Sequence, residues 1–395
     1  MNVCLIGAGC GVTQLTEEAR EALRKASFVT GAQRLVTACT FVTCPREPMT
    51  RPEEILDELL KREPQEACIL LSGDSGFYSG AAKLVPMLEE KGFHVRVLPG
   101  ISSMQVLAAR LKRPWQDWKL ASGHGVSCDP LEQIMCARPV FFLTSGKDAP
   151  AAIARALTDA GLGDLMITVG QDLGSAKEKI VCEKASSIRQ MEFSALNVVL
   201  TEAAPCYEKR TPGIPDAEFI REKIPMTKQE VRAAALAKLA LQPQDVCWDI
   251  GAGTGSVSVE MALHAGAVWA IEQKEEAFEL ARRNREKFCA WNMRLILGTA
   301  PEDLDAFPDP DAVFIGGSGG RLEEILTLIS KRAPKARVCV SAIALETLQK
   351  AYSVMQKLGY ETEVTQVAVS RSKKAADLSL LLAQNPVFLI SGAKK

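Results

Sequence analysis

The amino-acid sequence predicts an α/β protein of two domains. At 395 residues the chain is too long for one ordinary hydrophobic core, and it fits two domains of roughly 200 residues each. Both halves alternate short β-branched runs with helical patterns, which is typical of α/β folds. Residues 204–215 hold three prolines, a glycine and a charge cluster, and this composition continues neither a helix nor a central strand. We therefore predict a domain at 1–204, a linker at 205–214 and a second domain at 215–395.

In the first half, the β-branched runs predict strands at residues 3–6, 68–71, 94–98, 140–143, 165–169 and 197–200. Helical patterns lie between them at residues 16–26, 52–61, 80–91, 102–111 and 149–160. Thr16 is a favourable helix start because its hydroxyl can cap a free N–H, while Glu17 and Glu18 face the positive end of the helix dipole.

In the second half, helices are predicted at residues 228–241, 257–264, 275–288, 321–331 and 345–357. Strands are predicted at residues 246–250, 268–271, 294–297, 312–315 and 337–341. The chain closes on two extended runs, 363–370 and 378–389. This order predicts a doubly wound, Rossmann-like sheet that ends in an antiparallel hairpin.

Composition excludes several classes of function. Lys and Arg number 47 against 48 Asp and Glu, so the net charge of -1 predicts no general attraction to nucleic acid or to a membrane. No apolar segment approaches the ~18 residues that a membrane span requires, and the start of the chain lacks the pattern of an export signal. Three histidines and twelve cysteines without a C-x-x-C spacing predict no metal site, and reduced, mostly buried thiols in a cytoplasmic protein.

The strongest local motif is a glycine loop in the second half. Asp249 ends a predicted strand, and Gly251, Gly253 and Gly255 follow at alternate positions. Glycines there let the backbone turn sharply and approach a ligand beside the start of the next helix. Glu272 ends the next strand and can accept hydrogen bonds from both hydroxyls of a ribose. These features predict an adenosine-containing cofactor, S-adenosylmethionine.

Two other classes of enzyme fit this region less well. A nicotinamide-binding loop has a third small residue where Ser256 stands, and the acid two places before Gly251 is typical of methyltransferases rather than dehydrogenases. Methyltransferases that modify amino groups of nucleic acid carry an Asn/Asp-Pro-Pro-aromatic element after the fourth strand. This chain has the glycine-rich loop 316–320 there, which offers backbone N–H groups and suits a bulky anionic substrate better than a planar base.

The second half also resembles a known family, the decarboxylating precorrin methyltransferases of cobalamin biosynthesis, which have the class I fold. The resemblance runs from about residue 214 to the C-terminus. Its motifs are Pro225-Met226-Thr227-Lys228, Trp248-Asp249-Ile250-Gly251-Ala252-Gly253-Thr254-Gly255, Ala270-Ile271-Glu272, Gly298-Thr299-Ala300-Pro301-Glu302 and Asn385-Pro386-Val387-Phe388. It implies cofactor contacts at Thr227, Gly251, Ala252, Gly253, Thr254, Gly255, Glu272 and Ala300.

The first half resembles the tetrapyrrole methylase family, specifically its precorrin C5-methylating members, over about residues 2–200. The motifs are Gly7-Ala8-Gly9-Cys10-Gly11, Ser72-Gly73-Asp74-Ser75-Gly76-Phe77, Pro99-Gly100-Ile101-Ser102-Ser103, Ser122-Gly123-His124-Gly125 and Leu143-Thr144-Ser145-Gly146. Most of that family has proline where Ser75 stands, and the C5-methylating branch tolerates this departure. The resemblance implies cofactor contacts at Gly73, Asp74, Phe77 and Ser102. The loop of His124 has too little bulk to bury it, so a substrate contact and an exposed loop position both remain open.

Together the two resemblances imply a fused bifunctional enzyme that methylates C5 and C15 of a precorrin or cobalt-precorrin and removes the ring C acetate as carbon dioxide. The sulfonium is already activated, so alignment and exclusion of water suffice, and we assign no catalytic acid, base or metal. Cationic anchors are expected for the substrate carboxylates. The candidates are Lys228, Arg232, Arg321, Arg371, Lys373 and Lys374, of which two or three would touch the substrate. We also expect a homo-oligomer. The alternatives that stay open are an RNA methyltransferase, a dehydrogenase and a non-catalytic cofactor sensor.

Overall fold

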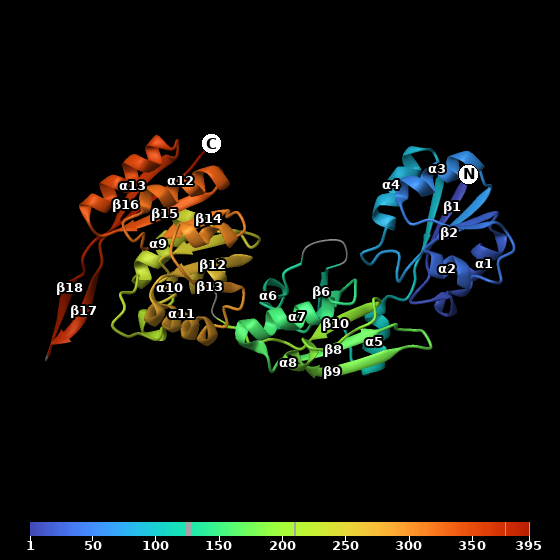
Figure 1. Ribbon diagram of the computed structural model, residues 1–395, viewed down its shortest axis with the longest axis horizontal. Coiled ribbons are helices and arrows are strands. Elements are labelled where there is room, and N and C mark those ends of the chain that lie inside the picture. Colours follow the sequence, from blue (N-terminus) through green and yellow to red (C-terminus); the bar gives the residue numbers. More distant parts are fainter. Residues whose placement is uncertain (124–127, 209–210, 376, 395) are drawn as a thin grey trace. The chain divides into compact units, whose positions relative to one another are not determined.

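The computed structural model describes residues 1–123, 128–208, 211–375 and 377–394 (Figure 1). The chain consists of two compact units. Unit 1 contains residues 1–133 and 138–204, and unit 2 contains residues 134–137 and 205–395. Each unit has its own sheets and its own hydrophobic core, as alternating strand and helix patterns require.

Unit 1 begins with a parallel five-stranded sheet in the order β3-β2-β4-β1-β5. Its strands are β1 (Asn2–Gly7), β2 (Phe28–Gly31), β3 (Arg46–Pro48), β4 (Glu66–Leu71) and β5 (His94–Leu98). Alternate residues of β1 enter two cores. Cys4 and Ile6 pack with α1 (Glu17–Lys25) and α2 (Gln33–Ala38), whereas Val3 and Leu5 pack with α3 (Pro52–Arg62) and α4 (Ala81–Glu90). Thr16 caps α1 as the sequence predicts, because its Oγ1 accepts from Ala19 N.

The second sheet of unit 1 is mixed, in the order β6-β7-β10-β8-β9. Its strands are β6 (Lys119–Ser122), β7 (Val140–Leu143), β8 (Met166–Gln171), β9 (Lys179–Lys184) and β10 (Asn197–Thr201). Its helices are α5 (Ser103–Leu111), α6 (Pro130–Gln133), α7 (Ala149–Leu157) and α8 (Ala185–Ile188). Ser102 begins α5 with a capping box: its side chain accepts from Gln105 N, and the Gln105 side chain accepts from Ser102 N.

Unit 2 is a seven-stranded sheet in the order β13-β12-β11-β14-β15-β19-β16, with only β19 antiparallel to its neighbours among the described strands. This is the class I methyltransferase order. The parallel strands are β11 (Val246–Ile250), β12 (Ala267–Glu272), β13 (Met293–Leu297), β14 (Ala312–Ile315) and β15 (Arg337–Ala342), followed by β16 (Glu361–Val367) and β19 (Val387–Ala393).

Helices cover both faces of this sheet (Figure 1). On one face Trp248 and Ile250 join a core with α12 (Leu322–Arg332) and α13 (Leu345–Lys357). The other face meets α9 (Gln229–Leu239), α10 (Ser256–Ala262) and α11 (Glu275–Lys287). Such a sheet places its loops at the carboxyl ends of the parallel strands, where α/β proteins bind ligands.

The C-terminal segment differs from the predicted hairpin. Each predicted extended run is two strands: β16 is followed by β17 (Ser370–Ala375), and β18 (Leu378–Ala383) is followed by β19. Pro386 lacks the N–H that a continuous ladder requires, so the pairing breaks between β18 and β19. Among the described strands, β17 and β18 pair only with each other, and they form a two-stranded ribbon that we call the arm (Figure 1).

The expected linker packs on unit 2 where it is described. Pro205 O accepts from Trp291 Nε1 at 2.7 Å, and the Tyr207 ring meets Phe288 edge to face at 4.9 Å. At its other end, Gly213 N donates to the carboxylate of Glu260. The proline-rich composition thus marks a chain that crosses the surface of unit 2 without regular secondary structure.

Candidate cofactor and substrate sites

The glycine loop of unit 2 lies between β11 and α10. Gly251, Gly253 and Gly255 have φ angles of 76°, 56° and 73°, in the left-handed region that favours glycine. A Cβ on Gly251 would lie 2.5 Å from Gly317 O, and a Cβ on Gly255 would lie 2.9 Å from a side chain of α11. At Gly253 the nearest heavy atom to a Cβ would be Pro225 O at 3.6 Å. Gly251 and Gly255 are therefore needed for packing, whereas Gly253 keeps the backbone open to a ligand.

Glu272 ends β12 beside this loop. Its carboxylate accepts from Gly253 N at 2.8 Å and from Lys274 N at 3.0 Å, and the residue is 7% exposed. A carboxylate has about four acceptor positions, so two remain for a ligand's hydroxyls. The contact with Lys274 is to its backbone and not to its ammonium group. Glu272 therefore orders the glycine loop as well as facing the space beside it.

A cavity of about 310 Å³ lies at the carboxyl ends of these strands. Four of the expected cofactor residues line it: Gly251, Gly253, Glu272 and Ala300. The other four lie in the same loops as lining residues but do not themselves border the cavity: Thr227, Ala252, Thr254 and Gly255. Further lining residues that sequence reasoning missed are Ile224, Ile271, Gln273, Lys274, Ala277 and Thr299. Their positions in the sequence could have indicated these residues, because most of them lie within or next to a motif segment.

Asp249 lies below the glycine loop and is almost fully buried. Its Oδ2 accepts from Ser258 Oγ, and its Oδ1 has no partner among the described residues. Burial raises the pKa of Asp249 to about 7, and the nearby charge of Glu272 acts in the same direction. Asp249 is therefore a carboxyl group whose charge depends on pH in the neutral range.

The expected substrate anchors fall in different places. Arg321 lines the cavity and pairs with Glu302 and Glu324, whose hydrogen bonds raise the pKa of Arg321. Lys228 is the residue before α9 and does not line the cavity. Lys373 and Lys374 are exposed on the arm.

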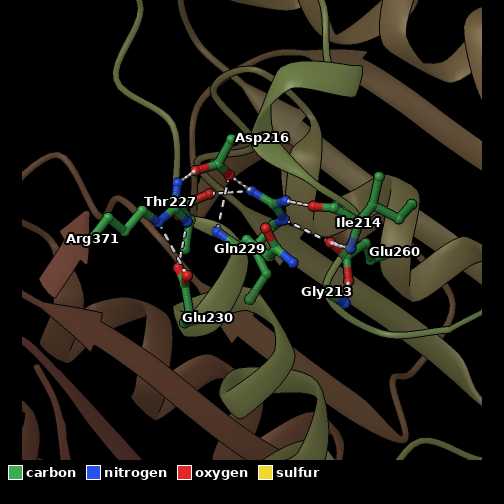
Figure 2. Close-up of polar contacts among 9 residues, drawn as sticks. Gly213, Ile214, Asp216, Thr227, Gln229, Glu230, Glu260 and Arg371 are labelled. Carbon is green, nitrogen blue, oxygen red and sulfur yellow. Dashed lines mark hydrogen bonds and ion pairs between the residues drawn. The ribbon is translucent and has the colours of Figure 1, made fainter. Parts of the chain in front are cut away.

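Two further expected anchors, like Arg321, are paired with carboxylates of the protein, and these pairs belong to one cluster (Figure 2). Arg232 is 0% exposed and pairs with Asp216 and Glu260. The assignment of Arg232 to substrate is wrong, because a fully buried guanidinium with two carboxylate partners cannot reach a ligand. Arg371 pairs with Glu230 and Asp216. His124, the last candidate, lies outside the described residues.

In unit 1 the corresponding turns meet at the carboxyl edge of the parallel sheet. Gly9 and Gly73 exchange two backbone hydrogen bonds of 3.1 and 2.8 Å. Gly7 and Gly100 approach so closely that a Cβ on Gly7 would lie 2.6 Å from Gly100 N. The motifs after β1, β4 and β5 therefore form one continuous surface.

A cleft of about 400 Å³ opens on this surface, between the two sheets of unit 1. Gly73, Phe77 and Ser102 line it as expected, but Asp74 does not. The carboxylate of Asp74 instead accepts from Gly76 N and Gly100 N, both at 2.9 Å. Asp74 ties the turn after β4 to the turn after β5, and its contact with the cofactor stays a prediction.

The cleft also contains residues that the sequence did not single out. Arg34 lines it near the start of α2 and donates to Cys10 O at 3.1 Å and to Ser72 Oγ at 2.8 Å. Among the described residues, no carboxylate lies within ion-pair distance of Arg34. Asn197 lines the opposite wall. The sequence could have indicated Arg34, because it lies shortly after β2 and the carboxyl ends of parallel strands share one edge of a sheet.

Other sites are not apparent in the part of the chain that is described. No group of three or more His, Cys, Asp or Glu residues there could hold a metal ion, and none of the described helices is long and apolar enough to cross a membrane. The cysteines are free thiols, but only Cys4, Cys39, Cys68, Cys247 and Cys339 are buried, so fewer are buried than the sequence suggested.

Comparison with known proteins covers both units. Residues 2–188 match the tetrapyrrole (corrin/porphyrin) methylases, and residues 218–394 match the precorrin methyltransferase domain. A precorrin-6Y C(5,15)-methyltransferase (decarboxylating) from Sinorhizobium is 32% identical over 325 residues, which is 80% of this chain and 78% of that protein. The chain belongs to the precorrin-6Y C5,15-methyltransferase (decarboxylating) family. It is therefore a methyltransferase of the cobalamin pathway that uses S-adenosylmethionine.

Shorter relatives match about half of this chain. A probable cobalt-precorrin-6B C(15)-methyltransferase (decarboxylating) from Sulfurisphaera tokodaii is 46% identical over 191 residues, 47% of this chain and 99% of that protein. The solved precorrin-6y C5,15-methyltransferase from Geobacter metallireducens is 43% identical and covers 46% of this chain and 97% of that chain, with a TM-score of 0.45.

Proposed function

We propose that this chain transfers methyl groups from S-adenosylmethionine to C5 and C15 of precorrin-6Y, or of its cobalt-containing counterpart, and releases the ring C acetate as carbon dioxide. The observation that carries this proposal is the pair of separate cavities, one in each unit, both built from glycine turns at the carboxyl edge of a parallel sheet. Two such cavities in one chain fit two methyl transfers better than one transfer, a hydride transfer or cofactor sensing.

The division of labour follows the matched families. The N-terminal domain, residues 1–204, would methylate C5, and the C-terminal domain, residues 215–395 after the linker 205–214, would methylate C15 and decarboxylate. A relative of about half this length is named for C15 methylation together with decarboxylation, which supports placing both events in one unit.

The cavity of unit 2 fits the cofactor. Glu272 offers a nearly buried carboxylate for the ribose hydroxyls, Gly253 leaves its backbone accessible, and Ile224, Ile271 and Ala277 supply apolar walls for a base. When bound, the sulfonium supplies an activated methyl group. The chain's own contribution would be to orient that group and exclude water from it. In unit 1 the corresponding contacts would come from Gly73, Phe77 and Ser102.

Substrate carboxylates need cations that face the two cavities. In unit 2, Arg321 and Lys274 line the cavity, and Lys228 lies on the adjacent loop. In unit 1, Arg34 is the cation that lines the cleft and lacks a carboxylate partner among the described residues. The conjugated macrocycle can accept the electron pair that stays behind when carbon dioxide leaves. We therefore assign no catalytic acid or base.

We also propose that the protein is a homo-oligomer that associates through the arm. Every residue of β18 is exposed, including Leu378, Leu380, Leu381 and Leu382, at 68%, 48%, 75% and 48%. A two-stranded ribbon is marginally stable in water, and a row of exposed leucines favours contact with another apolar surface. Light scattering should give a mass above that of one chain.

The free thiols fit a cytoplasmic location, and the balanced charge gives no reason to expect a nucleic-acid partner.

The direct test is a mass spectrum of a precorrin, and in parallel of a cobalt-precorrin, after incubation with the protein and S-adenosylmethionine. The proposal predicts a gain of two methyl groups and the loss of one carbon dioxide from one of the two substrates. If both substrates return unchanged while the protein is folded and binds the cofactor, the proposed function is wrong.

A further inference from the structure

A buried ion cluster in unit 2 plays no part in the activity described so far (Figure 2). At its centre is Arg232 on α9. Its Nε donates to Glu260 at 2.6 Å and its Nη1 donates to Asp216 at 2.9 Å. Its other described hydrogen bonds are to the carbonyl oxygens of Thr227 and Ile214, and its guanidinium lies over the Phe219 ring at 4.6 Å. Because burying a charge is costly unless it is paired and hydrogen-bonded, this cluster fixes the relative positions of every segment that it touches.

Those segments include one wall of the cofactor cavity. Ile224 and Pro225 line the cavity, and Arg232 holds the same loop a few residues later, at Thr227 O. Glu260, the partner on the other side of Arg232, is on the helix that begins at the glycine loop. Arg232 therefore ties the loop on one side of the cavity to the helix on the other side.

The cluster continues into the arm through Arg371 on β17. Arg371 binds Glu230, on the first turn of α9, through Nε at 3.1 Å and Nη2 at 2.5 Å. Its Nη1 donates to Asp216 Oδ2 at 3.1 Å, while Asp216 Oδ1 accepts from Arg232. The Asp216 side chain is 6% exposed and so has little access to water, whereas that of Arg371 is 38% exposed. Asp216 is the carboxylate shared by the buried arginine and the arm.

We propose that Arg232 and Arg371 are positioning residues for methyl transfer in unit 2, and that Arg371 makes the cofactor wall dependent on how the arm is placed. Loss of Arg371 would leave Oδ2 of a nearly buried Asp216 without its charged donor. The least costly response is a shift of the Asp216 carboxylate toward water. This shift would displace Arg232 and, through it, the loop that contains Thr227. The inference rests on the proposed cofactor site of unit 2.

The test compares Arg371→Ala with two other variants in the full chain. Carbon dioxide release reports the reaction of unit 2, so its KM for S-adenosylmethionine is the measured quantity. Arg371→Ala should raise this KM about tenfold, which corresponds to about 1.4 kcal/mol of cofactor binding, with a smaller change in kcat. Arg371→Lys, which keeps the charge, should recover part of the loss. Arg282→Ala is the matched control: Arg282 is 41% exposed and pairs with Glu279 and Glu286 on its own helix.

The outcomes separate the possible roles. An unchanged KM in Arg371→Ala would overturn the proposal, and so would an equal rise in Arg282→Ala. A lower melting temperature with reduced kcat and unchanged KM would mean that Arg371 is only structural, which also overturns it. Absence of carbon dioxide release from the unaltered protein, in contrast, would count against the proposed function itself. Arg232 is not used as the variant, because its removal would leave the fully buried carboxylate of Glu260 without a cationic partner, and a loss of folding would then hide any effect on positioning.

Discussion

The two cavities have different architecture. The cavity of unit 2 lies at the edge of one sheet, and its lining residues come from the loops after β11, β12, β13 and β14 and from Ile224 and Pro225. In unit 1 the cleft is assembled from turns after three strands and from the second sheet, with segments as distant as Gly9 and Asn197. Each site has a motif acid that accepts from two backbone N–H groups, Glu272 in unit 2 and Asp74 in unit 1. Glu272 lines its cavity and Asp74 does not, so we expect single substitutions in the unit 2 cavity to act on that site alone.

The largest expected effect is that of Gly253→Val. Valine is strained at a φ of 56° and its side chain would enter the cavity. Carbon dioxide release and methylation at C15 should be lost while methylation at C5 is retained, as mass spectrometry of the product would show. Gly359→Val is the control, because Gly359 also has a positive φ, 86°, and lies in open space. Loss of both methylations in Gly253→Val would mean that the two sites are not independent.

A smaller effect is expected from Glu272→Gln. The amide keeps the size but removes the charge, and a charged acceptor contributes about 1.5–3 kcal/mol per hydrogen bond. The affinity of unit 2 for S-adenosylmethionine should fall roughly ten- to a hundredfold, measured as the KM for carbon dioxide release. Because Glu272 also accepts from Gly253 N and Lys274 N, we expect a modest loss of stability as well. An affinity within about twofold of the unaltered protein, with Glu276→Gln as the exposed control, would remove the ribose role.

Asp249→Asn should change how stability depends on pH. The folded pKa of Asp249 is raised from 3.8 to about 7, so the ionised form is the less stable one in the fold. The unaltered protein should lose stability from about pH 4 to about pH 7, on the order of 2–4 kcal/mol at most, and asparagine should remove this loss. Urea unfolding of both proteins across that range measures the difference. If the free energy of unfolding depends on pH in the same way in both proteins, the pKa of Asp249 is not raised in the folded state.

The smallest effect is expected from cutting the chain between residues 204 and 205. Each unit has its own core, and the described part of 205–214 packs on unit 2. Fragments 1–204 and 205–395 should both fold, with melting temperatures near those in the full chain. A fragment that starts at 212 should be less stable, since it lacks the Pro205 carbonyl that Trp291 uses and the Tyr207 ring that covers Phe288. Aggregation of either longer fragment would show that the units depend on each other.

The sequence predicted the elements of unit 2 better than those of unit 1. Long parallel strands and amphipathic helices have a clear period, and the five predicted helices and five parallel strands of unit 2 all appear within a few residues. In unit 1 the short or polar strands β3, β6 and β9 were missed, since Arg46–Pro48 or Lys179–Lys184 carry little apolar pattern. The glycine turns were read correctly because glycine has a direct conformational meaning.

The roles of the charged residues could not be predicted from the sequence. Arg232 looks like any other surface cation until Asp216 and Glu260, 16 and 28 positions away, are brought against it by folding. The family resemblance assigned Asp74 to the cofactor, and no sequence pattern could show that its carboxylate accepts from backbone N–H groups, one of them 26 positions away. Which charges face a ligand is decided by tertiary pairing, and no local pattern reports it.

The central claim, that one chain holds two independent cofactor sites, is tested most directly by the stoichiometry of cofactor binding. Equilibrium dialysis of the full chain with labelled S-adenosylmethionine should give two molecules bound per chain. The Gly253→Val protein should bind one, and Gly359→Val should still bind two. One molecule per unaltered chain at saturation would contradict the account, because one of the two cavities would then have another purpose.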